Sequence, residues 1–428
     1  MSSLPDKLQA DINKTLGRLF QWFQTVHGPG GFGGPISHWW ESSMLYCGPM
    51  ADWRYEGILC GYVSLYRSTH DARWLDRAII AAEDVLSAQL ISGKFRNSAF
   101  QQGPMEGGTP HEAGVDVGLL ELATLFREIG DEHWQKYFRA AELNILRYQI
   151  GELWNGEGFK DQPWDPIMVP NKNATLIEAL ILYEVLSGQD MTLYLEKAVE
   201  VILSAQEKSG PRAGGIIHRG TGPHRLAIGI YNARSICGLL RAYERDPRDE
   251  ILDGVYGSIG FLHGLITQDG SYFGRYPDGS LIANPRMIAG SGDLLRAMAW
   301  GLKYFCGSEE DVLTLINVLT KAQLPTGGIP TGIGFAWRGS HYEYQSLPEF
   351  RDILPVAGWC DKAFRALALF TSQITDGEIG PVESECLWKG KKYIFRETTN
   401  EISLSELHNK KLIFQWKKFS NYPTVYLL

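Results

Sequence analysis

A sixfold repeat constrains the fold of this chain more than any other feature. Six amphipathic segments each carry a glutamine near their end, and a glycine-containing turn follows each glutamine, usually with a bulky aromatic or aliphatic residue. Glycine is expected where a helix stops in a left-handed conformation. Six copies in near-constant register predict a repeated helical hairpin. The glutamines are Gln24, Gln89, Gln149, Gln206, Gln268 and Gln323.

A second set of segments alternates with the first and is apolar nearly all round. A helix that is apolar on every side is buried, whereas the two-faced, glutamine-bearing helices are expected to lie outside. Six inner and six outer helices predict a closed (α/α)6 toroid, with an open solenoid as the alternative. The inner segments are 53–67, 112–128, 172–187, 226–244, 287–306 and 356–372.

The hairpins occupy residues 1–373, which we expect to form one all-α toroid domain. The remaining stretch, 374–428, breaks the pattern, and its segments 388–395 and 411–416 have the composition of strands. We expect a small β-rich C-terminal extension that covers an edge of the ring or makes a dimer contact. The long connections all precede inner helices, so function is expected at that face of the ring.

Composition excludes several classes of function. The 428 residues carry a net charge of −8, which argues against a nucleic-acid partner. No apolar run is long enough to cross a bilayer, and the N-terminus does not resemble a signal peptide, so we expect a cytoplasmic protein without a membrane partner. Nucleotide-binding motifs and metal-ligand spacings are absent, so no cofactor and no metal are expected.

The inner segments share a pattern in which a small residue precedes an acid or amide by three positions. Residues at i and i+3 share a helix face, so the polar side chains are expected to point toward the cavity or an adjacent groove. Paired carboxylates supply acid and base for catalysis, although acids in a first helical turn also complement the helix dipole. The polar residues are Asp116, Asn232, Asp293 and Asp361, with Glu56 at the equivalent place in the first hairpin.

Histidines, tryptophans and arginines gather in the same long loops. Such a mixture suits an acidic or hydroxyl-rich small molecule or oligosaccharide, with aromatic rings stacked on the ligand. The histidines are His38, His111, His218, His224 and His341. The catalytic candidates are Glu56, His111, Asp116, Asp293 and Asp361, and the substrate-binding candidates are Trp53, Arg54, His218, Asn232, Tyr272, Arg275 and Trp359.

The hairpins, together with Gln268-Asp-Gly-Ser-Tyr272 and the run Asn173-Ala-Thr-Leu-Ile-Glu-Ala-Leu-Ile-Leu-Tyr183, resemble the six-hairpin, (α/α)6-toroid glycosidase-like superfamily over about residues 5–373. That superfamily includes glycoside hydrolases, polysaccharide lyases, unsaturated uronyl hydrolases and sugar epimerases. The resemblance implies a carbohydrate ligand in the mouth of the toroid. We therefore expect a hydrolase, lyase or epimerase that acts on a saccharide, possibly an acidic one, by carboxylate and histidine acid–base chemistry.

Two alternatives remain. The glutamine and glycine-aromatic repeats are also similar to those of terpene cyclases and protein prenyltransferases, although the DxDD and DDxxD motifs are absent. That reading predicts a dry, aromatic pocket. The other alternative is a non-catalytic toroid that binds a glycan or a protein, with a shallow or plugged cavity. Its carboxylates would all be paired to arginines, namely Arg54, Arg225, Arg234 or Arg286.

Overall fold

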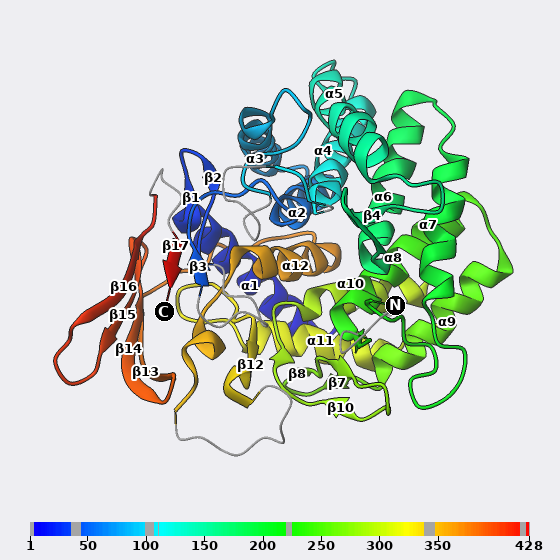
Figure 1. The fold of residues 1–428 in the computed structure, drawn as a ribbon. Coiled ribbons are helices and arrows are strands. Elements are labelled where there is room, and N and C mark those ends of the chain that lie inside the picture. The colour runs from blue at the N-terminus through cyan, green and yellow to red at the C-terminus, as the bar shows by residue number, and fades with distance from the viewer. Residues whose placement is uncertain are drawn as a thin grey trace.

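The computed structural model describes residues 4–35, 44–98, 107–109, 111–219, 225–337, 347–419 and 425–427. Within these residues twelve α-helices form two concentric layers (Figure 1). The inner helices are α2 (Arg54–Thr69), α4 (Glu112–Glu128), α6 (Pro170–Ser187), α8 (Gly229–Arg245), α10 (Ser291–Leu302) and α12 (Ala357–Leu367). The outer helices are α1 (Asp6–Val26), α3 (Ala72–Ala88), α5 (Trp134–Asn144), α7 (Thr192–Ser204), α9 (Asp249–His263) and α11 (Glu309–Lys321).

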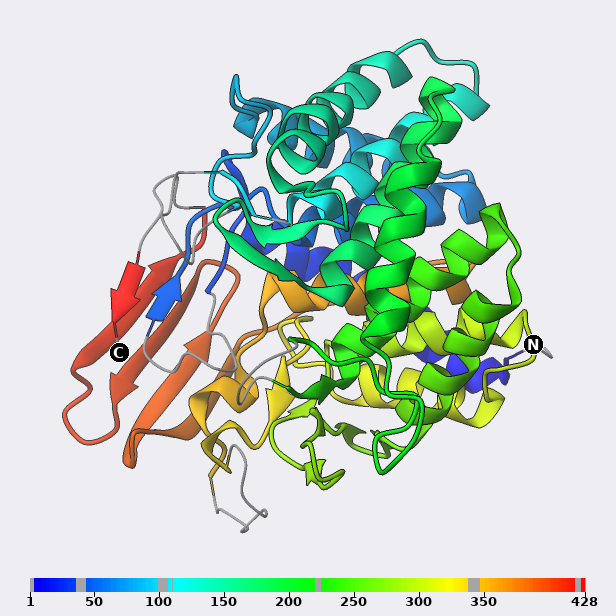
Figure 2. The same ribbon diagram turned by 45° about the vertical axis from the view of Figure 1, so that its right-hand side comes forward.

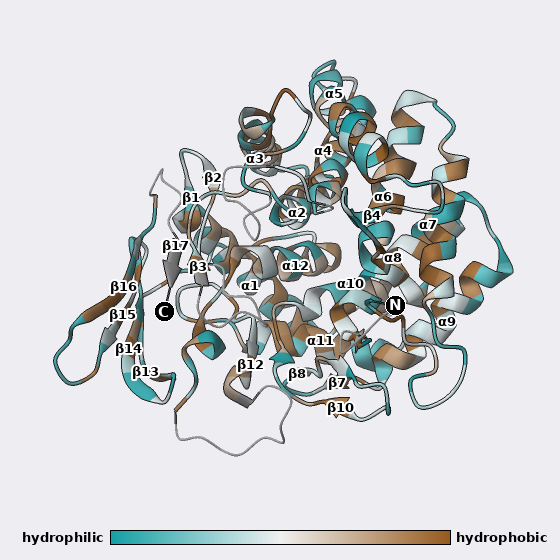
Figure 3. Ribbon diagram, in the orientation of Figure 1, coloured by the Kyte–Doolittle hydropathy of each residue, from teal (hydrophilic) through white to brown (hydrophobic). Residues whose placement is uncertain are grey.

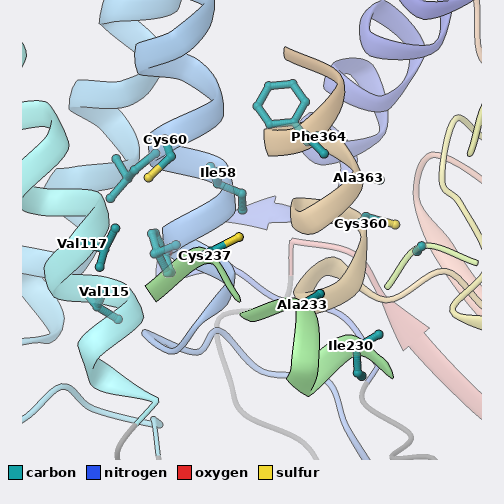
Figure 4. Close-up of a cluster of buried hydrophobic side chains, with 14 of the residues drawn as sticks. Ile58, Cys60, Val115, Val117, Ile230, Ala233, Cys237, Cys360, Ala363 and Phe364 are labelled. Atoms are coloured by element: carbon teal, nitrogen blue, oxygen red, sulfur yellow. The ribbon is translucent and has the colours of Figure 1, made fainter. Parts of the chain in front are cut away.

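The inner helices form a closed ring. Each packs against the next along the chain, and α12 packs against both α10 and α2. The closed toroid is therefore confirmed, and the open solenoid is wrong. Apolar and thiol side chains fill the spaces between the inner helices, among them Cys60, Val117, Cys237 and Phe364 (Figure 4). The outer helices α5 and α7 alternate apolar and polar stretches, as two-faced helices do (Figure 3).

Three of the repeated glutamines bond one hairpin to the next. Gln89 Nε2 donates to the Gly93 carbonyl in its own turn, at 3.1 Å, and to the Ala140 carbonyl of the next outer helix, at 2.7 Å. Gln206 and Gln323 make the same pair of contacts, to their own turn and to the following outer helix. Gln149 differs because α5 continues as a π-helix, Ile145–Leu153, and its amide donates instead to Asn144.

A second contact repeats around the ring and fixes the register of the inner helices. Within the first four residues of each inner helix, one side chain bonds to the bulky residue or its neighbour in the preceding turn. The Asn173 amide, for example, exchanges two hydrogen bonds of 3.0 Å with the backbone of Phe159. We call the six residues the anchor residues; they are Tyr55, Glu112, Asn173, Asn232, Ser291 and Cys360.

Short strands shape the long connections. They are β1 (His27–Gly28), β2 (Gly31–Phe32), β4 (Lys160–Gln162), β5 (Asp165–Met168), β6 (Ala227–Ile228), β7 (Ile266–Thr267), β8 (Gly270–Ser271), β9 (Gly274–Arg275), β10 (Leu281–Ile282), β11 (Arg286–Met287) and β12 (Gly332–Ile333). Three 3₁₀ turns cover Phe335–Trp337, Phe350–Ile353 and Ala368–Phe370. Among the described residues, no helix combines the length and apolar character that crossing a membrane requires.

The C-terminal stretch is β-rich, as expected. Strands β13 (Val382–Trp388), β14 (Lys391–Glu397), β15 (Glu401–Glu406) and β16 (Leu412–Lys417) form one antiparallel sheet in chain order. The sheet stands at one side of the ring in both Figures 1 and 2. Beside it, β17 (Val425–Leu427) pairs with β3 (Met44–Tyr46).

A buried polar contact joins this sheet to the ring. The Glu397 carboxylate accepts hydrogen bonds from Trp22 Nε1 on α1 at 2.8 Å, from Thr326 at 3.0 Å and from Lys418 Nζ at 2.9 Å. The side chains of Glu397 and Lys418 are at most 1 % exposed, so the contact is shielded from water. The sheet is therefore held against the ring by a specific buried contact as well as by apolar packing.

Candidate functional site

Four partly exposed side chains lie at the N-terminal ends of the inner helices. Each immediately precedes an anchor residue at the start of a helix that is otherwise buried, so each faces the space at the N-terminal ends of the inner helices. We call this end the mouth. The four mouth residues are His111, Lys172, Tyr231 and Trp359.

Trp53 and His218 join them. The rings of Trp53 and His111 lie 4.4 Å apart, and Trp53 Nε1 donates to the Gly358 carbonyl at 2.8 Å. The His218 ring lies 4.5 Å from that of Tyr231. Of the residues predicted from the sequence, the structure thus brings Trp53, His111, His218 and Trp359 to the mouth. His38, His224 and His341 lie outside the described residues.

Sequence analysis missed Lys172 at the mouth. Its ammonium forms an ion pair with the buried Asp161 carboxylate, which also pairs with Arg219. Burial lowers the pKa of Lys172, and the nearby Asp161 opposes that shift. The sequence feature that could have identified Lys172 is its position one residue before Asn173, at the start of the one inner helix that lacks the small-to-polar pattern.

Beneath the mouth, charged side chains from five inner helices fill the centre of the ring. All eight are buried, although the helices that carry them are mostly apolar. We call them the axial cluster; they are Glu56, Glu178, Arg234, Asp293, Arg296, Asp361, Lys362 and Arg365.

Glu56 is the most heavily paired member. Its carboxylate accepts hydrogen bonds from the Arg234 guanidinium at 2.9 and 2.6 Å and a further bond from Arg365. Lys362 Nζ lies 3.9 Å away. Burial alone would raise the pKa of Glu56, but these three cations hold it well below its usual range. Glu56 is therefore a permanent anion and a poor proton carrier.

Glu178 plays the same part deeper in the ring. Arg296 donates two hydrogen bonds to its carboxylate, one of them 3.0 Å long, and Arg365 donates another of 3.4 Å. The two arginines hold the pKa of Glu178 below its usual range despite its burial. Arg365 bonds to both Glu56 and Glu178, so it connects the upper and lower parts of the cluster.

Asp293 and Asp361 differ from these two glutamates. Burial raises the pKa of Asp293, against the opposing charges of Arg234, 3.7 Å away, and Lys362. Burial also raises the pKa of Asp361 to about 7, although Lys362 Nζ donates to it at 2.6 Å. Asp293 is 5 % exposed, whereas Glu56 and Asp361 are 0 % exposed. Asp293 is thus the axial carboxylate most accessible from outside.

Asn232 does not belong to this cluster, and its predicted orientation is wrong. Its amide donates to the Ile216 and Ile228 carbonyls and accepts from Ile216 N at 2.6 Å. The hydrogen bonds of this side chain are therefore made to backbone groups. The small-to-polar pattern matched Asn232 with Asp293, but Asn232 is an anchor residue and is equivalent to Ser291. The pattern therefore occurs at two different heights along the inner helices.

Asp116 is also displaced from the axial cluster. It follows the anchor Glu112 by four residues and so shares its face, and Glu112 accepts a hydrogen bond from Asn144 on outer helix α5 at 2.6 Å. Neither carboxyl oxygen of Asp116 has a hydrogen-bond partner among the described residues. Burial, followed by the charge of Glu112, raises its pKa well above the usual value.

Three binding candidates have local structural contacts. The buried Arg54 pairs with Asp52 at 2.8 Å and donates to the Phe32 carbonyl. Arg275 donates to the Gly279 carbonyl within its own hairpin, at 2.8 Å. The Tyr272 ring lies 5.4 Å from the Arg286 guanidinium. These contacts stabilise the long loops and leave ligand contact by the three residues untested. Within the described part of the chain, no three His, Cys, Asp or Glu side chains are grouped to hold a metal.

Neither a protein-family model nor a curated protein sequence matches this chain. Solved structures do. A D-mannose isomerase is 14% identical, with a TM-score of 0.59 over 86% of this chain and 99% of its own. An unsaturated glucuronyl hydrolase specific for heparin is 12% identical (TM-score 0.60; 86% and 100% covered), and a sugar epimerase from a ruminal bacterium is 13% identical (0.60; 85% and 98%). The resemblance to the six-hairpin toroid superfamily is confirmed at the level of the fold.

Proposed function

We propose that this chain is a carbohydrate-active enzyme whose substrate enters the toroid at the mouth and is converted beside Asp293. The observation that carries the proposal is the position of Asp293, the least buried carboxyl group of the axial cluster at 5 % exposed and one with a raised pKa, among cations at the centre of the ring. The similar structures include an isomerase, a hydrolase and an epimerase of saccharides, which supports a sugar as the ligand.

The mouth suits a sugar ring. Trp53, Tyr231 and Trp359 are half-buried aromatic side chains that would stack on the C–H faces of a pyranose. His111 and His218 lie beside two of these rings and would hydrogen-bond or exchange protons with hydroxyl groups. A sugar held there would have its deepest atoms nearest Asp293.

The chemistry we propose is general acid–base catalysis. A carboxyl group with a raised pKa carries a proton for part of the time near neutral pH, so it can donate or accept one. Arg234 and Lys362 would stabilise negative charge that develops on the sugar. Lys172 and Arg219 add two cations beside the mouth, around Asp161, which favours a substrate with a carboxylate.

A second candidate is a toroid that binds saccharide without turnover. The full pairing of Glu56 and Glu178 to arginines favours it, because ion pairs that only stabilise the ring would look the same. The isoprenoid alternative gains no support, since eight charged side chains occupy the centre where a dry aromatic pocket was expected.

Incubation with sugars in D2O, followed by proton NMR, tests the proposal. The panel contains D-mannose, D-glucose, cellobiose and an unsaturated glucuronyl disaccharide. Deuterium at C2 would identify an epimerase or isomerase, and a new reducing end would identify a hydrolase. Asp293→Asn should slow the conversion by about 10²–10⁴-fold, and Asp116→Asn should not. Binding of a panel sugar without conversion would favour the second candidate, and an active Asp293→Asn variant would refute the role of Asp293.

A further inference from the structure

The end of the ring opposite the mouth is hollowed. A cavity of about 520 Å³ lies where the C-terminal ends of α8 and α10 meet the 3₁₀ turn after α12. We call it the far cavity. Its described lining is Arg241, Arg296, Ala299, Trp300, Leu302, Lys303, Leu369 and Phe370.

Among its described residues the lining holds three cations and no carboxylate. Helix C-termini favour positive side chains, which accounts for basic residues gathering at this end. Two of the three pair with acids outside the described lining: Arg241 with Glu121 at 3.2 Å, and Lys303 with Glu244 at 2.7 Å. The described lining therefore presents guanidinium and ammonium groups, and their acidic partners are not among its residues.

Arg241 retains hydrogen-bonding capacity. Glu121 is shared, because Arg67 also bonds to it at 3.1 Å, and Arg241 Nε has no hydrogen-bond partner among the described residues. A buried donor without a hydrogen-bond partner costs free energy, and a hydrogen bond to an anionic oxygen would offset that cost.

Trp300 organises the cationic wall. The guanidinium groups of Arg241 and Arg296 lie 5.4 and 5.3 Å from its ring centroid, and its Nε1 donates to Glu244 at 3.0 Å. Glu244 also holds Lys303, so the three cations are placed by contacts to a few shared side chains. Such fixed donors bind an anion with little loss of side-chain entropy.

We propose that the far cavity binds a small phosphate ester, with its phosphate on Arg241 and Lys303 and its organic part against Leu302, Leu369 and Phe370. Each of the three cations already pairs with an acid, namely Glu121, Glu178 or Glu244, and a phosphate dianion competes with these acids better than a carboxylate monoanion does. Guanidinium groups also fit phosphate oxygens in pairs. The volume exceeds what a single ion fills and lies within the range of small-molecule sites.

Arg296 would couple the far cavity to the mouth. Arg296 lines the far cavity, bonds to Glu178 in the axial cluster and follows Asp293 by one helical turn on α10. A phosphate that draws Arg296 away from Glu178 would change the charge balance around Arg365 and Glu56.

Titration calorimetry at constant ionic strength tests the site, with glucose 6-phosphate, glucose and glucuronate as probes. Glucose 6-phosphate should bind, and the two other sugars should bind at least tenfold more weakly. Arg241→Gln and Lys303→Gln should each weaken binding about tenfold. Lys197→Gln, which removes a lysine paired to one acid on outer helix α7, should leave it unchanged.

Leu369 allows two further variants that break no ion pair, because it is an apolar residue. It lines the far cavity and is 53 % exposed, so substitution should not disturb the core. Leu369→Glu should weaken binding of glucose 6-phosphate severalfold, and Leu369→Lys should strengthen it. Three results would each overturn the proposal: no heat of binding, equal affinity for glucuronate, or affinities of the Leu369 variants equal to wild type. Weakening by Lys172→Gln but not by Arg241→Gln would place the phosphate at the mouth and would also overturn it.

Discussion

Glu56 on α2 and Arg234 on α8 join opposite sides of the ring through two hydrogen bonds of 2.9 and 2.6 Å. In the order of the inner helices, α8 is three helices from α2 in either direction. The pair therefore spans the centre of the toroid, 178 residues apart in sequence. Packing between adjacent inner helices closes the ring, and this contact joins two helices on opposite sides of its axis.

Breaking that contact should destabilise the protein strongly. Glu56→Gln would remove the buried negative charge that Arg234 and Arg365 share, and loss of one partner from a buried pair costs about 3–5 kcal/mol. Urea unfolding would measure the loss. Glu250→Gln removes an exposed acid 3.3 Å from Arg248 and should change stability by less than about 1 kcal/mol. Equal effects of the two variants would contradict the axial role.

The fold was predictable because the repeat is a property of the chain itself. Predicted segments 112–128 and 172–187 coincide with α4 and nearly with α6. In three of the hairpins the glutamine that marks the repeat also bonds one hairpin to the next, namely Gln89, Gln206 and Gln323. The glutamine and glycine pattern repeats six times along the chain, so it can be recognised from the sequence alone.

The candidate site was only partly predictable. Asn232 and Asp293 occupy the same position in the small-to-polar pattern, but they lie at different heights along their helices. The anchor contacts that set this difference join residues in different elements, so the sequence pattern does not show it. Glu178, Arg296 and Arg365 were missed, although each stands between two apolar residues in sequence. A charge inside an apolar helix needs a partner, and that was the usable signal. Which charges pair across the ring depends on the register of all the inner helices.

Asp293→Asn should reduce turnover of the substrate identified in D2O by about 10²–10⁴-fold, the usual contribution of a general acid or base. Folding should be little affected, because the pair between Glu56 and Arg234 remains. The wild-type rate should also show an ionisation above the ordinary range for an aspartate, because burial raises the pKa of Asp293, and the variant should lack it. Stopped assays from pH 4 to 9 would measure both, and an unchanged profile would remove Asp293 from the mechanism.

Asp116→Asn should leave stability nearly unchanged at low pH and raise it relative to wild type as pH increases. Its pKa is raised on folding, so the native state holds the proton more tightly than the unfolded state. The stability from this group is therefore complete below its unfolded pKa and is lost as pH rises through the folded pKa. Urea midpoints at pH 5, 7 and 9 should fall faster for wild type, and parallel lines would argue against a protonated Asp116.

Glu112→Gln should destabilise the protein although it changes the residue as little as Asp116→Asn does. Glu112 accepts hydrogen bonds from Phe95 N at 3.1 Å, Gly108 N at 2.6 Å and Asn144 Nδ2 at 2.6 Å. An amide would turn an N–H group toward one set of these donors, and each unmet buried donor costs about 1–3 kcal/mol. Differential scanning calorimetry beside Asp116→Asn would measure the contrast. A higher Tm for Glu112→Gln would refute the anchor role.

Gln89→Leu should test whether the sixfold repeat stabilises the ring as its contacts imply. The variant leaves the carbonyls of Gly93 and Ala140 without the amide that joins them, at a cost of about 1–3 kcal/mol. Gln268→Leu is the matched control, because Gln268 has the same place in its repeat but is exposed to solvent. Urea unfolding should show a loss for Gln89→Leu and almost none for Gln268→Leu. Similar values for both would mean that the glutamines mark the hairpins without holding them together.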